Sequence, residues 1–173
     1  MKPFKEALPV IAQSAYSDLH TLNHSYAVGE YVESSNIKGD IIECGIAAGS
    51  NLMALCYRSF EMNNPLKRNF WGFDSFEGIQ LAGKEDDLQA GIGPITHNTN
   101  VDPLELLISS GVTVHPLENV KSNFKNWGVN PDLMRFIKGW VQHTIPTVKE
   151  RIEKIAILRL DMDVYDPTLF TLR

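Results

Sequence analysis

The sequence GDIIECGIAAGS, residues 39–50, decides the fold. Residues 41–44 form a short apolar run typical of a buried strand, and a turn of small residues follows it. Ser50 is the expected N-cap of a helix, which the apolar spacing after it predicts. A second apolar run, residues 70–73, comes after this helix and leads directly to Asp74. Strand, helix and strand in this order predict a parallel sheet.

The remaining patterns extend this alternation of helices and strands. Apolar spacing predicts a helix over residues 14–33, before the first strand, and another over residues 116–127. Strands are expected at residues 134–139 and 155–160. Between these two strands, Pro146 is expected in the first turn of a further helix.

We therefore expect a single α/β domain over residues 1–173. An N-terminal helical segment, residues 1–38, would precede a core, residues 39–173, in which helices cover both faces of a parallel sheet. Residues 78–100 are rich in Gly, Asn, Asp and Thr, and so long a connection is typical of a lid or a disordered segment.

Composition argues against several classes of protein. The 16 basic and 21 acidic residues give a formal net charge of -5 and are spread along the chain, which disfavours a nucleic-acid-binding protein. No apolar run approaches the roughly 20 residues of a membrane span, and the first residues lack the apolar stretch of a signal peptide. The two cysteines lie in apolar segments, typical of free thiols in a reducing compartment. We expect a cytoplasmic protein that binds neither nucleic acid nor membrane.

Small residues fill the turn after the first strand. Gly45, Ala47 and Gly49 would let the backbone approach a ligand closely, and Ser50 begins a helix with free N–H groups. Glu43, just before the first glycine, suits a cationic ammonium group better than a pyrophosphate. Dinucleotide-binding domains have glycine where Ala47 stands, which disfavours an NAD-dependent dehydrogenase. A tight turn with small residues for packing explains the same pattern equally well.

A carboxylate stands at the end of the second predicted strand. Asp74 can accept hydrogen bonds from both hydroxyls of a ribose, as the acid of dinucleotide-binding domains does. Ligands of open α/β sheets bind outside the carboxyl ends of the strands, so Glu43, Asp74, Gly139 and Asp161 are expected around one crevice. The alternative for Asp74 is a turn or a helix cap that involves the residues after it.

Two carboxylates flank Met162 after the fourth predicted strand. Alternate residues of a strand face the same side, so the side chains of Asp161 and Asp163 can converge. A pair of carboxylates suits a hard divalent cation such as magnesium, which would lower the pKa of a coordinated alcohol. The alternative is that one of them caps the helix expected near Pro167.

Four segments resemble motifs of the macrocin O-methyltransferase family, whose members methylate hydroxyls, chiefly on the deoxysugars of antibiotics. They are residues 39–45, residues 73–78, residues 136–146 and residues 158–165. The second of them, FDSFEG, is the most specific match. The order and spacing of the segments agree with the family from about Leu22 onward.

The resemblance implies a Rossmann-like class I methyltransferase fold, S-adenosylmethionine as the methyl donor, and a magnesium-assisted transfer to a hydroxyl of a sugar or another small molecule. It implies that Asp161 is the first metal ligand and a candidate catalytic base. The carboxylate pair described above makes Asp163 a further candidate ligand. The residues that it places at the cofactor are Glu43, Gly45, Ala47, Gly49, Ser50, Asp74, Ser75, Phe76, Gly139 and Trp140.

The sequence departs from the family's pattern on the acceptor side. Met162 stands where the family usually has glycine. Asp166 and Pro167 replace a Glu–Ser pair, and Gln142 and His143 replace an acidic pair. These differences bear on which substrate the protein accepts.

The family's next strand carries two neighbouring aspartates that complete the metal site, and the sequence ends before such a strand. We therefore expect a sheet that lacks its last strands, in a fragment or a natural truncation. The strand at residues 155–160 would be an apolar edge, which favours a homo-oligomer. The alternative function is an S-adenosylmethionine-binding protein without catalysis.

Overall fold

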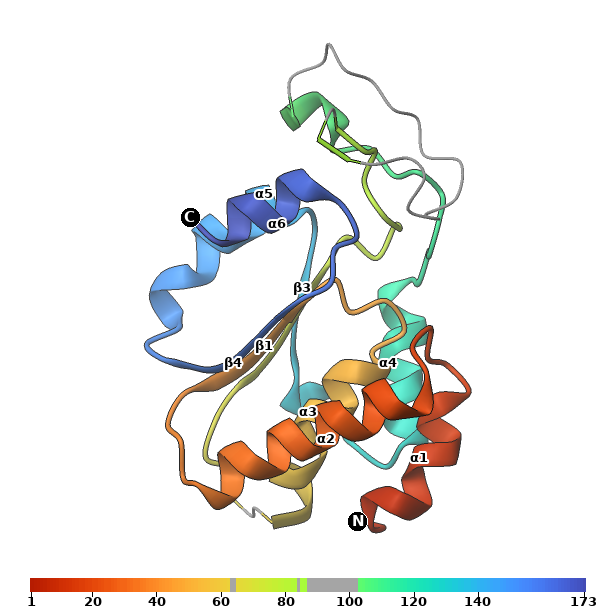
Figure 1. The fold of residues 1–173 in the computed structure, drawn as a ribbon, viewed down its shortest axis with the longest axis vertical. Coiled ribbons are helices and arrows are strands. Elements are labelled where there is room, and N and C mark those ends of the chain that lie inside the picture. Colours follow the sequence, from red (N-terminus) through yellow and green to blue (C-terminus); the bar gives the residue numbers. More distant parts are fainter. Residues whose placement is uncertain (63–64, 84, 87–102) are drawn as a thin grey trace.

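Four parallel strands form a sheet in the order β3-β2-β1-β4, which confirms the predicted α/β class (Figure 1). The computed structural model describes residues 1–62, 65–83, 85–86 and 103–173. The strands are β1 (Asp40–Cys44), β2 (Phe70–Asp74), β3 (Arg135–Lys138) and β4 (Ile155–Leu160). The helices are α1 (Phe4–Ala12), α2 (Leu19–Ser34), α3 (Ser50–Met62), α4 (Leu117–Asn126), α5 (Val141–Val148) and α6 (Tyr165–Thr171).

The sheet separates two apolar clusters. Ile41 belongs to the larger cluster and Ile42 to the smaller one, because successive side chains of a strand point to opposite faces. Helices α1 to α4 contribute to the larger cluster, whereas α5 packs on the other face against Trp71 and Phe73 of β2. Figure 1 shows α5 and α6 together on this second side. Helices therefore cover both faces, as predicted.

The N-terminal region differs from its prediction. A helix was expected over residues 14–33, but α2 begins only at Leu19, and a separate helix, α1, ends before this range at Ala12. Asp18 fixes the start of α2, because its carboxylate accepts a hydrogen bond from the backbone N–H of Thr21 at 2.8 Å. Tyr16, which the apolar spacing assigned to a helix, lies in the break between the two helices.

Two predicted helix starts are also wrong. Helix α5 begins at Val141, so Pro146 lies inside the helix rather than in its first turn. The reason is that two backbone N–H groups of the first turn already donate to the carbonyl of Trp140. Ser50 is the first residue of α3 rather than its cap, and its hydroxyl donates to the carbonyl oxygen of Ile11 in α1.

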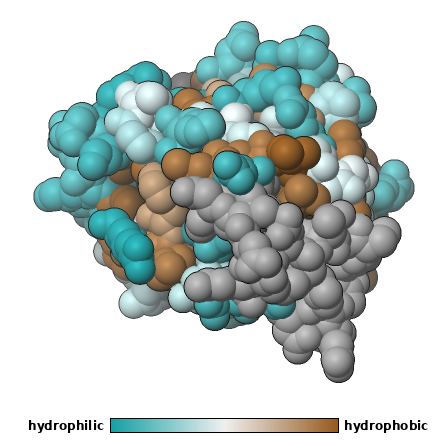
Figure 2. Space-filling model, turned by 90° about the horizontal axis from the view of Figure 1, so that it is seen from above, coloured by the Kyte–Doolittle hydropathy of each residue, from teal (hydrophilic) through white to brown (hydrophobic). Residues whose placement is uncertain are grey.

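Strand β4 lies at one edge of the sheet within the described part of the chain. Ile155 and Leu158 are 49% and 41% exposed, so β4 is less buried than its apolar sequence indicated. Other large apolar side chains are exposed as well, and Figure 2 shows hydrophobic atoms in a band among hydrophilic ones on the face seen from above. The expected homo-oligomer stays a prediction.

Much of the predicted long connection, residues 84 and 87–100, lies outside the described residues. In the part that is described, Gln80 forms an isolated antiparallel bridge with Ser109. None of the helices in the described ranges is long and apolar enough to cross a membrane.

Candidate active site

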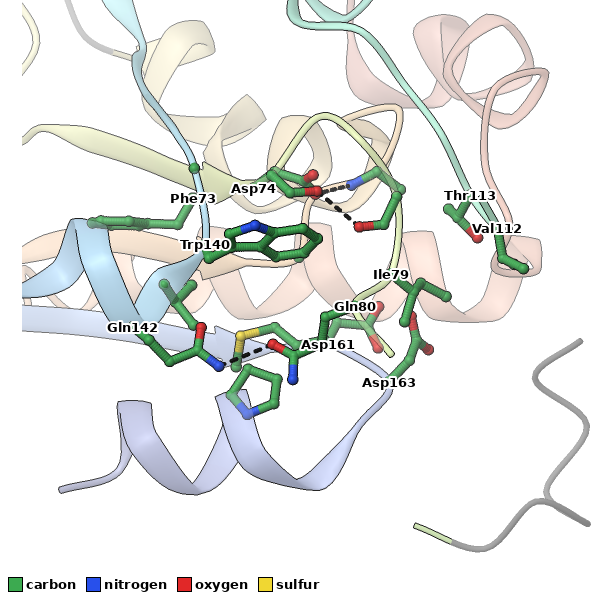
Figure 3. Close-up of a pocket in the computed structure, with 18 of the residues that line it drawn as sticks. Phe73, Asp74, Ile79, Gln80, Val112, Thr113, Trp140, Gln142, Asp161 and Asp163 are labelled. Atoms are coloured by element: carbon green, nitrogen blue, oxygen red, sulfur yellow. Dashed lines mark hydrogen bonds between the residues drawn. The ribbon is translucent and has the colours of Figure 1, made fainter. Parts of the chain in front are cut away.

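A cavity of about 400 Å³ lies at the carboxyl ends of the strands. Sites for small molecules usually measure about 300–1,000 Å³. Residues at or after the end of every strand line it (Figure 3). The lining residues that the sequence predicted are Gly45, Ala47, Asp74, Ser75, Gly139, Trp140, Asp161 and Asp163.

Asp74 is the last residue of β2, and its carboxylate ties two loops together. Its Oδ2 accepts hydrogen bonds from the N–H groups of Ile46 (2.9 Å) and Ala47 (3.0 Å), and its Oδ1 accepts one from Phe76 (2.7 Å). Burial raises the pKa of Asp74, and the three N–H groups oppose this shift. A carboxylate has about four lone-pair positions, so an acceptor position remains for a ligand hydroxyl. The turn and the binding interpretations of Asp74 are therefore compatible.

The turn after β1 needs its glycines for packing. Gly45 has a φ of +79°, and a Cβ there would lie 2.1 Å from the carbonyl oxygen of Asp161. At Gly49, with a φ of +90°, a Cβ would lie 2.6 Å from a ring carbon of Phe124 in α4. Gly45 lines the cavity, whereas Gly49 is not among the described residues that line it. The packing interpretation therefore accounts for Gly49.

Glu43 was predicted beside the cofactor, but the structure places it inside the sheet. It is 1% exposed and is not among the described residues that line the cavity. Its carboxylate accepts a hydrogen bond from Arg159, its neighbour across the β1–β4 pairing. Burial raises the pKa of Glu43 to about 8, against the attraction of the Arg159 guanidinium. Because β1 continues to Cys44, Glu43 stands one residue short of the strand end.

Two further predicted residues, Ser50 and Phe76, are not among the described residues that line the cavity. Ser50 is buried against α1, and Phe76 packs within the larger apolar cluster. Phe76 contributes to the site through its backbone N–H, which donates a hydrogen bond to the carboxylate of Asp74. Ser75 does line the cavity, and its hydroxyl donates to the carbonyl of Gly78 at 2.8 Å, which holds the following turn.

Asp161 and Asp163 both line the cavity, although β4 ends at Leu160 and strand alternation does not apply to them. Asp163 has a φ of +65°, so the chain turns there. Arg159 donates to Oδ2 of Asp161 at 2.8 Å. Partial burial, and then the negative charge of Asp161, raise the pKa of Asp163. In the described ranges, no group of three or more His, Cys, Asp or Glu side chains could hold a metal ion.

Sequence reasoning missed three side chains that line the cavity: Tyr16, Gln80 and Gln142 of α5. Gln80 and Gln142 form part of its wall, and Nε2 of Gln142 donates to Oε1 of Gln80 at 2.9 Å (Figure 3). Tyr16 also lines the cavity, and its hydroxyl lies 3.0 Å from Nε2 of His115. No local pattern relates residues so distant in sequence. The departure from the family at Gln142 was the available signal.

Comparisons with known proteins agree with this arrangement. A family model described as Macrocin-O-methyltransferase (TylF) matches residues 8–173. The demethyldecarbamoylnovobiocin O-methyltransferase of Streptomyces niveus is 32% identical over 145 residues, which are 83% of this chain and 49% of that protein. The 8-demethyl-8-(2,3-dimethoxy-alpha-L-rhamnosyl)-tetracenomycin-C 4'-O-methyltransferase of Streptomyces olivaceus is 30% identical over 146 residues, 84% of this chain and 50% of that protein. The chain thus spans about half the length of these curated relatives.

Solved structures are similar as well. The O-methyltransferase NovP matches with a TM-score of 0.68 at 26% identity, over 92% of this chain and 60% of that chain. The calicheamicin methyltransferase CalS11 matches with a TM-score of 0.60 at 22% identity, over 98% of this chain and 64% of that chain, and supports the fold alone. The family match over nearly the whole sequence, on a parallel sheet with its cavity at the strand ends, shows that this chain belongs to the macrocin O-methyltransferase family.

Proposed function

We propose that the protein is an S-adenosylmethionine-dependent O-methyltransferase that acts on a hydroxyl of a sugar or another small molecule. The family supports methyl transfer to oxygen, and the rhamnosyl group in the name of one relative supports a sugar acceptor. The observation that carries the proposal is Asp74, which lines the cavity and keeps an acceptor position for a ribose hydroxyl.

Several residues around the cavity are assigned a role in binding the cofactor or in the transfer reaction. When bound, S-adenosylmethionine supplies an electrophilic methyl group. Asp74 would accept its ribose hydroxyls, Gly45 and Ala47 would border it through their backbone, and Trp140 would provide a flat wall. Asp161 would orient the acceptor hydroxyl and take its proton as the new O–CH₃ bond forms and the S–CH₃ bond breaks.

Magnesium assistance is a second part of the proposal. Mg²⁺ is usually held by one or two carboxylates, with water and substrate in its other positions. Asp161 and Asp163 offer two carboxylates at the cavity. Partial burial and then the negative charge of Asp161 raise the pKa of Asp163, and a cation between the two carboxylates would oppose this shift. Arg159, which already binds Asp161, would compete with the ion for the same oxygen. The ion would lower the pKa of the acceptor hydroxyl.

Calorimetric titration tests the cofactor. S-adenosylmethionine and its product S-adenosylhomocysteine should both bind the 173-residue protein, and NAD should not. Binding of NAD with no binding of either sulfur compound would overturn the proposal in favour of the dehydrogenase alternative.

Transfer of a labelled methyl group tests the reaction. The label should move from S-adenosylmethionine to members of a panel of glycosides, and Mg²⁺ should increase the rate. Tight cofactor binding without transfer to any glycoside would instead favour the alternative, a binding protein without catalysis.

A further inference from the structure

The wall formed by Gln80 and Gln142 contains two polar atoms that have no partner. The two amides share one hydrogen bond, from Nε2 of Gln142 to Oε1 of Gln80 at 2.9 Å (Figure 3). This contact uses one polar atom of each side chain. The remaining atoms, Nε2 of Gln80 and Oε1 of Gln142, are both buried and make no hydrogen bond with the residues that the structure describes.

Two buried polar atoms without hydrogen-bond partners, side by side, are unusual in a folded protein. More than about 90% of buried polar groups in native structures have a hydrogen-bond partner, because an unpaired buried group loses its contacts with water and gains nothing in return. Gln80 is 3% exposed, and both glutamines line the cavity. The two unpaired atoms are therefore best explained by a ligand that completes them.

The chemistry of the pair is fixed even if the amides rotate. A glutamine amide offers an N–H₂ donor at one atom and a carbonyl acceptor at the other. If both amides turned over, Gln80 would donate to Gln142, and one carbonyl and one N–H₂ group would again remain free. The pair therefore presents one donor and one acceptor, and it carries no charge.

We propose that Gln80 and Gln142 together form a recognition point for a neutral ligand group that has a hydrogen-bond donor and an acceptor side by side. An anionic group would find only one donor there, and a cation only one acceptor. Two parts of the proposed reactants have the required chemistry: the amino edge of the cofactor's adenine, and neighbouring hydroxyls of a sugar acceptor. The inference rests on the proposed function.

Two substitutions test the pair, each removing one amide while keeping a similar volume: Gln80→Leu and Gln142→Leu. Gln13→Leu is the matched control, since Gln13 is exposed at the end of α1 and is not among the described residues that line the cavity. Circular dichroism confirms that each variant is folded. If Gln80→Leu does not fold, Gln142→Leu carries the same test, because that side chain is only half-buried.

The first measurement is the dissociation constant of S-adenosylhomocysteine by calorimetry. We call Gln80→Leu and Gln142→Leu the cavity variants. If their affinity for S-adenosylhomocysteine is at least tenfold weaker while that of the control is unchanged, the proposed recognition point is supported and the adenine is its ligand. If this constant is unchanged, methyl α-L-rhamnopyranoside is added to protein loaded with S-adenosylhomocysteine, and its binding is followed by saturation-transfer NMR. Loss of the glycoside signal in the cavity variants supports the pair and identifies the acceptor hydroxyls.

Cavity variants that behave like the wild type toward both ligands overturn the inference, whether or not the glycoside binds. A wild-type protein that does not bind S-adenosylhomocysteine refutes the proposed function instead, so the two failures are distinguishable. The thermal midpoint gives an independent readout. Without ligand, the double variant Gln80→Leu/Gln142→Leu should melt at or above the wild-type temperature, because it removes both unpaired atoms together with the hydrogen bond that joins the two amides.

Discussion

Glu43 and Asp74 stand near the ends of neighbouring strands, and both were predicted to bind the cofactor. In the structure Glu43 is buried beside Arg159 within the sheet. Asp74 instead lines the cavity and accepts hydrogen bonds from three backbone N–H groups. The difference lies in the strands: β1 continues for one residue beyond Glu43, and β2 ends at Asp74. Whether a carboxylate near a strand end is buried in the sheet or lines the cavity therefore depends on its position by a single residue.

The largest effect is expected at the partner of Glu43. At pH 9, above the pKa of about 8 of Glu43, Arg159→Leu should lower the free energy of unfolding by about 3 kcal/mol, because it leaves a buried carboxylate without its cation. Urea denaturation at pH 9 measures this loss. Adding Glu43→Gln to the same protein should recover most of it, since a neutral amide costs less to bury. If the double variant is no more stable than Arg159→Leu alone, the pairing does not account for the position of Glu43.

The next effect distinguishes Asp74 from Glu43 by the affinity for the cofactor. Asp74→Ala should weaken the binding of S-adenosylhomocysteine by about 1–3 kcal/mol, the usual cost of leaving polar partners unpaired. Glu43→Gln should leave this affinity unchanged, and so should Asp132→Ala, which removes an exposed carboxylate elsewhere. Calorimetry on the three variants decides. Equal losses at Glu43 and Asp74 would show that both acids contact the cofactor.

The pH dependence of stability should also single out Glu43. Its pKa is about 8 in the folded protein, against 4.5 for an unperturbed side chain. Below pH 4.5 its contribution to stability is fully present, and it is lost as the pH rises through about 8, because the folded state holds the proton more tightly. The free energy of unfolding should fall by at most about 1.4 kcal/mol per pH unit in this window. Glu43→Gln should flatten the slope, and an unchanged slope would assign it to another group.

The smallest effect on stability is expected at Asp161, an exposed carboxylate that also binds Arg159. Asp161→Asn should change the free energy of unfolding by less than about 0.5 kcal/mol, as is usual for surface positions. It should leave the affinity for S-adenosylhomocysteine nearly intact and abolish any stimulation of methyl transfer by Mg²⁺. A variant that does not fold would instead favour a capping role for this residue.

These residues show which parts of the molecule local sequence predicts. Apolar runs separated by Gly, Pro and Asp were sufficient for the four strands, and therefore for the strand ends that bring Asp74, Gly139 and Asp161 to one cavity. The same patterns did not place Glu43, although the predicted strand ended at Cys44 as β1 does, because its partner in the sheet, Arg159, is 116 positions away in the sequence.

Local sequence patterns could not predict contacts between segments that are distant in the sequence. Gln80 and Gln142 are 62 positions apart, and only the folded chain brings their amides together. The break before α2 was missed because the capping bond of Asp18 competes locally with a helix that the apolar spacing alone would continue.

The contact between Glu43 and Arg159 has a consequence for how the protein is made. The two residues are 116 positions apart, and parallel pairing joins the strands that carry them. At about 5–20 residues per second, the ribosome needs roughly 6–23 seconds after Glu43 to synthesise its partner. During that interval β1 has no neighbour on its β4 side, and the carboxylate that will be buried must stay in water. The pairing of β1 on this side therefore cannot form until β4 has been synthesised.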